Sequence, residues 1–217
     1  MHKGVLAIWN DCLPEVEKQY EDWYMNQHLP ERVGIPGFRI GRRYDALAAE
    51  PRYFTYYDTD TPEVLWSETY RERLANPTVE TAEIMKYFRN MSRTVCRRVS
   101  QTGDDVSGCI VTVQLDRLPE DAAQLQEVLL SSIGVTGAET WEAVEVPVAD
   151  DSVESKYRIS RDETIGAAMI FHVMREQDAL DASDILSRAF GDQARIGAYQ
   201  LLCELRAETL KYTRIEH

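Results

Sequence analysis

Hydrophobic positions along this chain follow two periods, one typical of strands and one typical of helices, and the two alternate in a fixed order. Residues 4–9 form a short apolar run that predicts a strand, and residues 14–28 carry apolar side chains at helical spacing behind a proline. Pro30 is expected to end this helix. The pattern continues as β-α-β-β-α-β, with further elements predicted at 38–45, 52–58, 62–76, 79–88 and 91–99.

The same order of elements starts again after a polar stretch at residues 101–105, which we interpret as a linker. The second set is predicted at 106–113, 119–133, 139–146, 165–174, 178–190 and 196–207. In both halves a glycine, Gly4 or Gly108, precedes the first strand, and a Leu-Pro pair follows nine or ten residues later. The pattern therefore predicts a tandem repeat, with one copy at 1–103 and a diverged copy at 104–217.

A single β-α-β-β-α-β unit of the ferredoxin-like kind is an open antiparallel sheet with helices on one face only. Its other face has to be covered, and a second copy in the same chain can cover it. We therefore expect an α+β fold in which two ferredoxin-like repeats pack sheet to sheet as an intramolecular barrel. Residues 150–163 interrupt the second copy and are expected to form a long solvated hairpin loop or, alternatively, a flap over the cavity.

The two copies differ in the side chains they offer for chemistry. Fourteen of the twenty aromatic residues precede the linker, so we expect the first copy to carry the site and the second to serve as scaffold. Counted from the Leu-Pro pair, Tyr24 and His28 of the first copy correspond to Leu129 and Ile133 of the second.

Composition excludes several classes of partner. With 24 basic and 37 acidic side chains, the net charge of −13 opposes binding to nucleic acid or to an anionic membrane surface. No apolar run reaches transmembrane length and no signal peptide precedes the first strand, so we expect a cytoplasmic protein. The cysteines lie far apart without a CxxC pair, which favours free thiols at Cys12, Cys96, Cys109 and Cys203.

His28, on the predicted helix at 14–28, is the leading candidate for catalysis. Tyr24 lies one turn earlier on the same face, and a histidine beside a tyrosine hydroxyl is a workable pair for general acid–base chemistry. In the last turn of a helix, the negative end of the helix dipole favours the protonated imidazole. The alternative is that His28 caps the helix by donating to a terminal carbonyl, or simply packs, and the sequence leaves these interpretations open.

Arginine and aromatic side chains nearby are candidates for substrate binding. Arg32 or Arg42 could anchor a carboxylate or phosphate. Alternation along the strand at 38–45 places Arg42 and Tyr44 on one face, and Arg39 and Arg43 on the other, where we expect solvent. The aromatic candidates for the wall of the site are Trp9, Trp23, Tyr44 and Tyr56 or Tyr57.

The remaining motifs narrow the chemistry. His172 is interpreted as a satisfied histidine on a strand face, with a metal or haem ligand as the alternative. No HExxH, GxSxG, P-loop or GxGxxG motif occurs, so zinc protease, triad hydrolase, nucleoside triphosphatase and dinucleotide-dependent activities lack support. We therefore expect neither a metal nor a cofactor.

Several short motifs carry a family resemblance over roughly the first half of the chain. They are Trp23-Tyr24, His28-Leu29-Pro30-Glu31-Arg32, Pro36-Gly37-Phe38 and Arg42-Arg43-Tyr44, supported by Pro51-Arg52-Tyr53 and Asn76-Pro77-Thr78. With these motifs the first copy resembles the EthD-like branch of the dimeric α/β-barrel superfamily, whereas the second copy resembles it only in element order. The resemblance implies ferredoxin-like units paired into a barrel with a central cavity.

The resemblance implies a wide range of activities, because fold restricts function only weakly. The superfamily includes cofactor-free monooxygenases of quinone-forming pathways, polyketide cyclases, muconolactone-type isomerases, haem enzymes such as chlorite dismutases, and accessory proteins. We expect a cofactor-independent lyase, isomerase or cyclase that acts on a small aromatic or cyclic oxygenated acid, with His28 and Tyr24 as the catalytic pair. The alternatives are a non-catalytic ligand-binding accessory protein, and a cofactor-free monooxygenase or haem protein. Pairing of two chains through outer surfaces is also possible.

Overall fold

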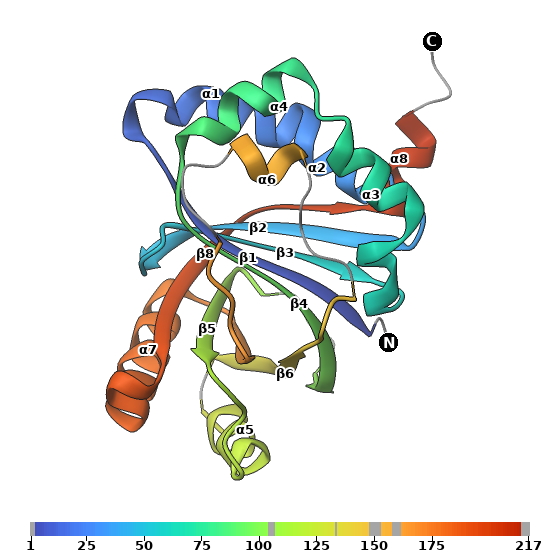
Figure 1. Ribbon diagram of the computed structural model, residues 1–217. Coiled ribbons are helices and arrows are strands. Elements are labelled where there is room, and N and C mark those ends of the chain that lie inside the picture. Colours follow the sequence, from blue (N-terminus) through green and yellow to red (C-terminus); the bar gives the residue numbers. More distant parts are fainter. Residues whose placement is uncertain (1–2, 104–106, 133, 148–152, 158–161, 214–217) are drawn as a thin grey trace.

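The computed structural model describes residues 3–103, 107–132, 134–147, 153–157 and 162–213, and its strands close into one barrel (Figure 1). The strands are β1 (Gly4–Cys12), β2 (Phe38–Ala48), β3 (Tyr53–Thr59), β4 (Phe88–Thr102), β5 (Cys109–Leu115), β6 (Val135–Ala143), β7 (Ala167–Val173) and β8 (Arg195–Arg206). Each predicted strand is present, with its ends moved by a few residues. The predicted start of the fifth strand, Val106, lies outside the described residues.

Helical segments cover the outside of the barrel. The α-helices are α1 (Glu17–Trp23), α2 (Leu29–Val33), α3 (Glu68–Ala75), α4 (Val79–Ile84), α5 (Ala122–Leu130), α6 (Val153–Tyr157), α7 (Glu176–Phe190) and α8 (Ala207–Thr213). Shorter segments are the 3₁₀ turns η1 (Pro14–Val16), η3 (Pro62–Trp66), η4 (Met85–Tyr87) and η5 (Gly191–Gln193), and one π-helical turn, η2 (Tyr24–His28). Within the described ranges, no helix combines the length and the apolar character needed to cross a membrane.

The strand order shows the two repeats and how they join. Around the barrel the strands run β1-β3-β2-β8-β5-β7-β6-β4, and every neighbouring pair is antiparallel. The sheet β4-β1-β3-β2 and its counterpart β8-β5-β7-β6 each have the ferredoxin-like order, so the predicted fold class is confirmed. The sheets also pair edge to edge, through β2 with β8 and β4 with β6, and these two seams close the barrel.

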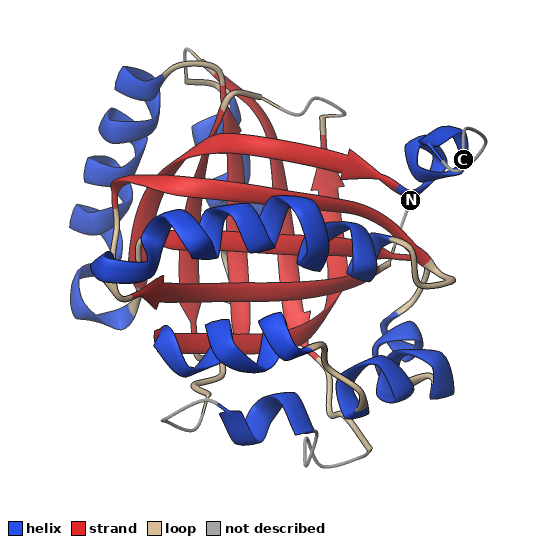
Figure 2. Cartoon of the chain, turned by 90° about the horizontal axis from the view of Figure 1, so that it is seen from above, coloured by secondary structure: helices blue, strands red, loops and turns tan. Residues whose placement is uncertain are grey.

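Three apolar layers result from this closure. The inner layer fills the barrel with fully buried side chains such as Trp9, Phe54 and Trp141. One outer layer lies between the first sheet and the helices α1 to α4, and the other lies between the second sheet and α5 and α7. Figure 1 shows α1 to α4 together with α6 on one side of the barrel, and Figure 2 views the same side with the helices lying over the strands.

Strand β3 explains why the sequence lacks simple alternation in this region. All seven of its residues are buried. Phe54 and Tyr56 belong to the inner layer, and Tyr53 and Tyr57 belong to the outer layer under the helices. A strand with both faces covered has no polar side, so rings occur at successive positions.

The first helix differs from its prediction because Pro30 does not end it. The helical path runs from α1 through η2 into α2 and stops at Gly34. In the wide π-helical turn, the Leu29 N–H donates to the Tyr24 carbonyl, five residues earlier. Proline has no N–H to donate, and it is tolerated directly after a turn that has already interrupted the usual ladder.

Two further expectations are corrected. Gln101 and Thr102, expected in the linker, pair with β6 as the end of β4. Part of the stretch expected to be a hairpin loop, 150–163, folds as the short helix α6 instead. Residues 104–106 lie outside the described part of the chain, as does Ile133, so the boundary between 103 and 104 stays a proposal.

Candidate functional site

The barrel wall divides the predicted site residues into two groups. Four belong to the interior of the barrel: Trp9, Arg42, Tyr44 and Tyr56. The other four lie outside the barrel, beneath the helices: Trp23, Tyr24, His28 and Arg32. The expectation of one central cavity that gathers all of them is therefore corrected, because strand alternation sends Arg42 and Tyr44 inward while the helix lies on the outer face of the sheet.

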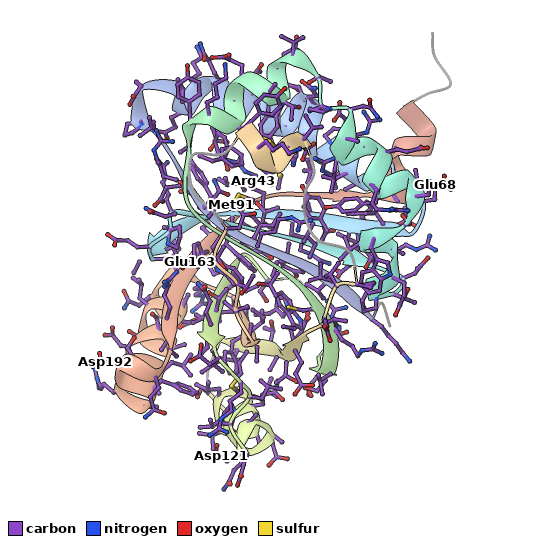
Figure 3. All side chains as sticks on the ribbon, viewed as in Figure 1. Arg43, Glu68, Met91, Asp121, Glu163 and Asp192 are labelled. Atoms are coloured by element: carbon purple, nitrogen blue, oxygen red, sulfur yellow. The ribbon has the colours of Figure 1, made fainter. Side chains whose placement is uncertain are left out.

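Three of the outer group, Tyr24, His28 and Arg32, line a cavity between the first sheet and its helices, and Trp23 packs behind His28. The volume of this cavity is about 30 Å³, which is room for about two water molecules. Its lining residues come from β1, β3, β4, η2, α2, α3, η4 and α6: Leu6, Ile8, Asn10, Tyr24, His28, Arg32, Tyr57, Tyr70, Leu74, Met85, Phe88, Met91, Arg93 and Glu154. Figure 3 labels Met91 and Arg43 in this layer between strands and helices.

His28 is held against two aromatic rings at this cavity. Its ring centroid lies 4.4 Å from that of Trp23 and 5.0 Å from that of Tyr24, and only 6% of its surface is exposed. The helix continues to Val33, so His28 is not in the last turn. The two arguments that depended on that position, stabilisation of the imidazolium by the helix dipole and capping of the helix end, therefore lose their basis.

A pair of tyrosine hydroxyls lies beside His28. The hydroxyl oxygens of Tyr24 and Tyr57 are 3.5 Å apart, and both side chains are buried. Burial raises the pKa of Tyr24 and raises the pKa of Tyr57 well above its usual value, so both remain protonated and can donate hydrogen bonds near neutral pH. Of the two tyrosines considered from the sequence, Tyr57 reaches this cavity and Tyr56 does not.

Arg32 supplies the positive charge of the cavity. It is 3% exposed, and its Nη2 contacts both carboxylate oxygens of Glu154, Oε2 at 2.6 Å. Burial lowers the pKa of Arg32, but the adjacent carboxylate raises it by more, so the guanidinium stays charged. Its Nη1 is buried and has no hydrogen-bond partner among the described residues. A second arginine, Arg93, also lines the cavity and donates to the Tyr70 hydroxyl at 2.7 Å.

The interior of the barrel holds a buried network of charged side chains. Arg42 contacts Asp58 at 2.7 Å, and the other oxygen of Asp58 contacts Arg98 at 2.5 Å. Arg98 continues to Glu139 at 2.6 Å, and Glu139 contacts Nε2 of His172 at 3.0 Å. Burial raises the pKa of Glu139, but the hydrogen bond with His172 and the charge of Arg98 outweigh it and lower that pKa to about 2.

This network makes Arg42 an unsuitable anchor for a ligand. Besides Asp58, its guanidinium contacts Glu204 at 2.7 Å and the Tyr56 hydroxyl at 3.0 Å. Tyr44 and Tyr56 stack beside it in the packed inner layer. These residues therefore belong to the packed interior of the barrel, and of the two arginines considered as anchors, Arg32 is the one that lines the cavity.

The residues present do not fit a haem group. His172 uses Nε2 for Glu139 within a packed barrel interior, and the cavity at His28 is far too small for a macrocycle. Across the described ranges, no group of three or more His, Cys, Asp or Glu side chains is placed to hold a metal ion. The four cysteines are free thiols, as expected, and Cys96 and Cys109 are buried.

Sequence reasoning missed four polar residues of the cavity: Asn10, Tyr70, Arg93 and Glu154. Glu154 is 122 residues from Arg32, and it lies in a stretch whose composition indicated only a solvated loop. Tyr70 and Arg93 lie on elements that were predicted, but nothing in their spacing relates them to His28. Asp58, Arg98 and Glu139 of the barrel interior were missed for the same reason.

Comparison with known proteins identifies the fold. No family model and no curated protein sequence matches this chain. Among solved structures, an anthrone oxidase-like protein has a TM-score of 0.59 at 10% identity, with 95% of this chain and 93% of that chain covered. A candidate monooxygenase from Fusobacterium nucleatum has a TM-score of 0.55 at 8% identity, with 94% of each chain covered.

A candidate chlorite dismutase is also similar, with a TM-score of 0.52 at 9% identity and 99% of this chain and 100% of that chain covered. At such identities the likeness concerns the fold alone. The chain therefore has the fold of the dimeric α/β-barrel proteins, and its single chain supplies both halves of the barrel.

Proposed function

We propose that this chain is a cofactor-independent enzyme that acts by proton transfer on a small aromatic or cyclic oxygenated acid. One observation carries the proposal: three buried side chains, His28, Tyr24 and Arg32, meet at one cavity. The same three residues belong to the motifs that resemble the EthD-like branch, and membership of that branch is part of the proposal.

Each group has a distinct role. Arg32 holds the carboxylate of the substrate, and the ring of Trp23 keeps His28 oriented. His28 removes a proton from a carbon next to a carbonyl group, and the electron pair moves onto the carbonyl oxygen. Tyr24 donates a hydrogen bond to that oxygen, where the negative charge develops in a site of low polarity. Return of the proton to a different carbon completes an isomerisation, and loss of a leaving group completes an elimination.

Two alternatives share this site. The contact between Arg32 and Glu154 favours a non-catalytic ligand-binding protein. Arg32 is the only described arginine that is buried in the cavity wall, and the carboxylate of Glu154 already pairs with it. A cofactor-free monooxygenase would use the same proton removal and then let the carbanion react with molecular oxygen. The likeness to monooxygenase-type structures supports the fold for this alternative.

The proposal is tested by following proton transfer directly. A panel of small aromatic and cyclic oxo-acids is incubated with the protein in D₂O, and mass spectrometry measures deuterium uptake at carbon. An oxygen electrode records oxygen consumption in parallel. We expect His28→Ala to lower the uptake rate by about 10²–10⁴-fold, with Tyr24→Phe producing a smaller loss. Gln177→Ala, a change at an exposed position of α7 against the second sheet, serves as the control for handling and folding.

The outcomes of this test distinguish the proton-transfer enzyme, the binding protein and the monooxygenase. Uptake by His28→Ala within about threefold of wild type removes His28 from the mechanism. Tight binding of an acid without deuterium uptake or product supports the binding protein instead. Oxygen consumption that depends on His28 identifies the monooxygenase.

A further inference from the structure

Helix α6 is attached to the rest of the molecule in an unusual way. Among its side chains that the structure describes, Glu154 alone is buried, at 4% exposure, whereas Lys156 and Tyr157 are exposed. A short helix normally docks through apolar side chains. Here the buried contact is a carboxylate, and it reaches Arg32 from beside α3 and α4 (Figure 1).

The contact with Glu154 uses only half of the guanidinium. Both carboxylate oxygens approach the same nitrogen, Nη2 of Arg32, and Nη1 is buried with no hydrogen-bond partner in the part of the chain that the structure describes. Arginine and a free carboxylate prefer a two-nitrogen geometry, with one oxygen on each nitrogen. The guanidinium therefore has an unused donor on the wall of the cavity.

The size of the cavity points to the same residue. A volume of about 30 Å³ holds no organic acid, and Glu154 is one of the residues that line it. Among the lining residues, Glu154 is the one acidic side chain, set against Arg32 and Arg93. Removal of Glu154 would leave the guanidinium of Arg32 without this carboxylate at the cavity beside His28.

We propose that the carboxylate of Glu154 occupies the place of a ligand carboxylate, and that a small carboxylic acid binds Arg32 by displacing Glu154 and α6 from the cavity. This inference rests on the ligand site of the proposed function but requires no chemistry at His28. The exchange replaces one carboxylate by another, so the buried charge of Arg32 stays paired throughout.

The exchange also makes the site selective. A neutral ligand that displaced Glu154 would leave Arg32 unpaired in a buried site, which is strongly unfavourable. A carboxylate ligand restores the pair and can use Nη1 as well. Glu154 is tethered to the site, so it competes at a high effective concentration, and its removal should strengthen binding of a carboxylate.

The test compares benzoate with benzamide, which has a similar shape and no charge. Affinities are measured by isothermal titration for wild type, Glu154→Gln and Glu163→Gln. Glu163 is the matched control because it belongs to the same part of the chain, is exposed, and pairs with Arg195 at the surface. We expect Glu154→Gln to bind benzoate about tenfold more tightly than wild type, with much less change for benzamide and none in the control.

Benzoate affinity of Glu154→Gln that is unchanged or weaker than in wild type overturns the inference, and so does equal strengthening for benzamide. A second measurement uses the wild-type chain, in case Glu154→Gln does not fold. The protease Lys-C cleaves after lysine, and Lys156 lies on α6. Benzoate should speed cleavage at Lys156 relative to cleavage at Lys18, an exposed lysine on α1, and slower or unchanged cleavage contradicts the proposal.

Failure of this inference is distinguishable from failure of the proposed function. If benzoate displaces Glu154 but no acid of the panel takes up deuterium, the inference stands and the proposed enzymatic function is wrong. If deuterium uptake depends on His28 but Glu154→Gln binds benzoate as wild type does, the inference is wrong and the proposed enzymatic function stands.

Discussion

Arg42 and Arg43 are neighbours on β2, yet their guanidinium groups lie on opposite sides of the barrel wall. Arg42 joins Asp58 inside the barrel, whereas Arg43 lies outside, with its guanidinium carbon 4.3 Å from the ring centre of Tyr24 and 4.8 Å from that of Tyr20. Arg43 is fully buried, so the solvated face expected for it is corrected. Both arginines stabilise the fold, and neither faces the cavity.

The two arginines considered as anchors can be separated by ligand binding. Arg32→Gln should weaken benzoate binding about tenfold or more, because it removes the buried cation of the cavity. Arg42→Gln should leave the affinity within about threefold of wild type, since its partners lie inside the barrel. Titration of both variants with benzoate checks this. A larger loss of affinity in Arg42→Gln than in Arg32→Gln would make Arg42 the anchor.

The buried carboxylate of Asp58, between two arginines, should make a large contribution to the free energy of unfolding. Asp58→Asn removes the charge that pairs both Arg42 and Arg98, and we expect it to lower the free energy of unfolding by about 3 kcal/mol or more. Asp60→Asn is the matched control, because its partner Arg39 is exposed, and it should cost less than about 1 kcal/mol. Urea unfolding of the two variants measures the difference, and equal losses would contradict it.

Acid should weaken the barrel through Glu139. The pKa of Glu139 is lowered to about 2, below that of the unfolded chain, so its contribution is present above the unfolded pKa and disappears as the pH falls towards 2. The stability difference between wild type and Glu139→Gln should therefore shrink by about 2 kcal/mol between about pH 5 and pH 2.5. Urea unfolding at both pH values tests this, and a constant difference would show that Glu139 has an ordinary pKa.

Residues 1–103 expressed alone should aggregate or self-associate. Without the second half, β2 loses its partner β8, β4 loses β6, and the inner layer is uncovered. The full chain is expected to complete one barrel alone, although two chains can still pair through outer surfaces. Analytical ultracentrifugation of both decides the matter, since a folded and strictly monomeric fragment would show that the first sheet needs no partner.

The strands and their repeat could be predicted from the sequence because the spacing of hydrophobic residues within each element is a local property. The same order of elements also occurs in both halves. The sequence also grouped Trp23, Tyr24, His28 and Arg32, since they lie within ten residues on one helical path. It failed at Pro30, because a π-helical turn is set by packing and leaves no local signature.

The in-or-out placement of side chains was the harder problem. Alternation separates Arg42 from Arg43 but does not say which face meets the barrel interior when both faces are buried. The contact between Arg32 and Glu154 was beyond reach for another reason, since it joins residues 122 positions apart through a helix of five residues.

The two seams, β2 with β8 and β4 with β6, have an evolutionary consequence. In a barrel built from two identical chains, every substitution occurs twice, so a change that suits one half is imposed on the other. In this chain each position is inherited once. The second half can therefore have Leu129 in its core, at the position that corresponds to Tyr24 when counted from the Leu-Pro pair, while the first half has a polar cavity.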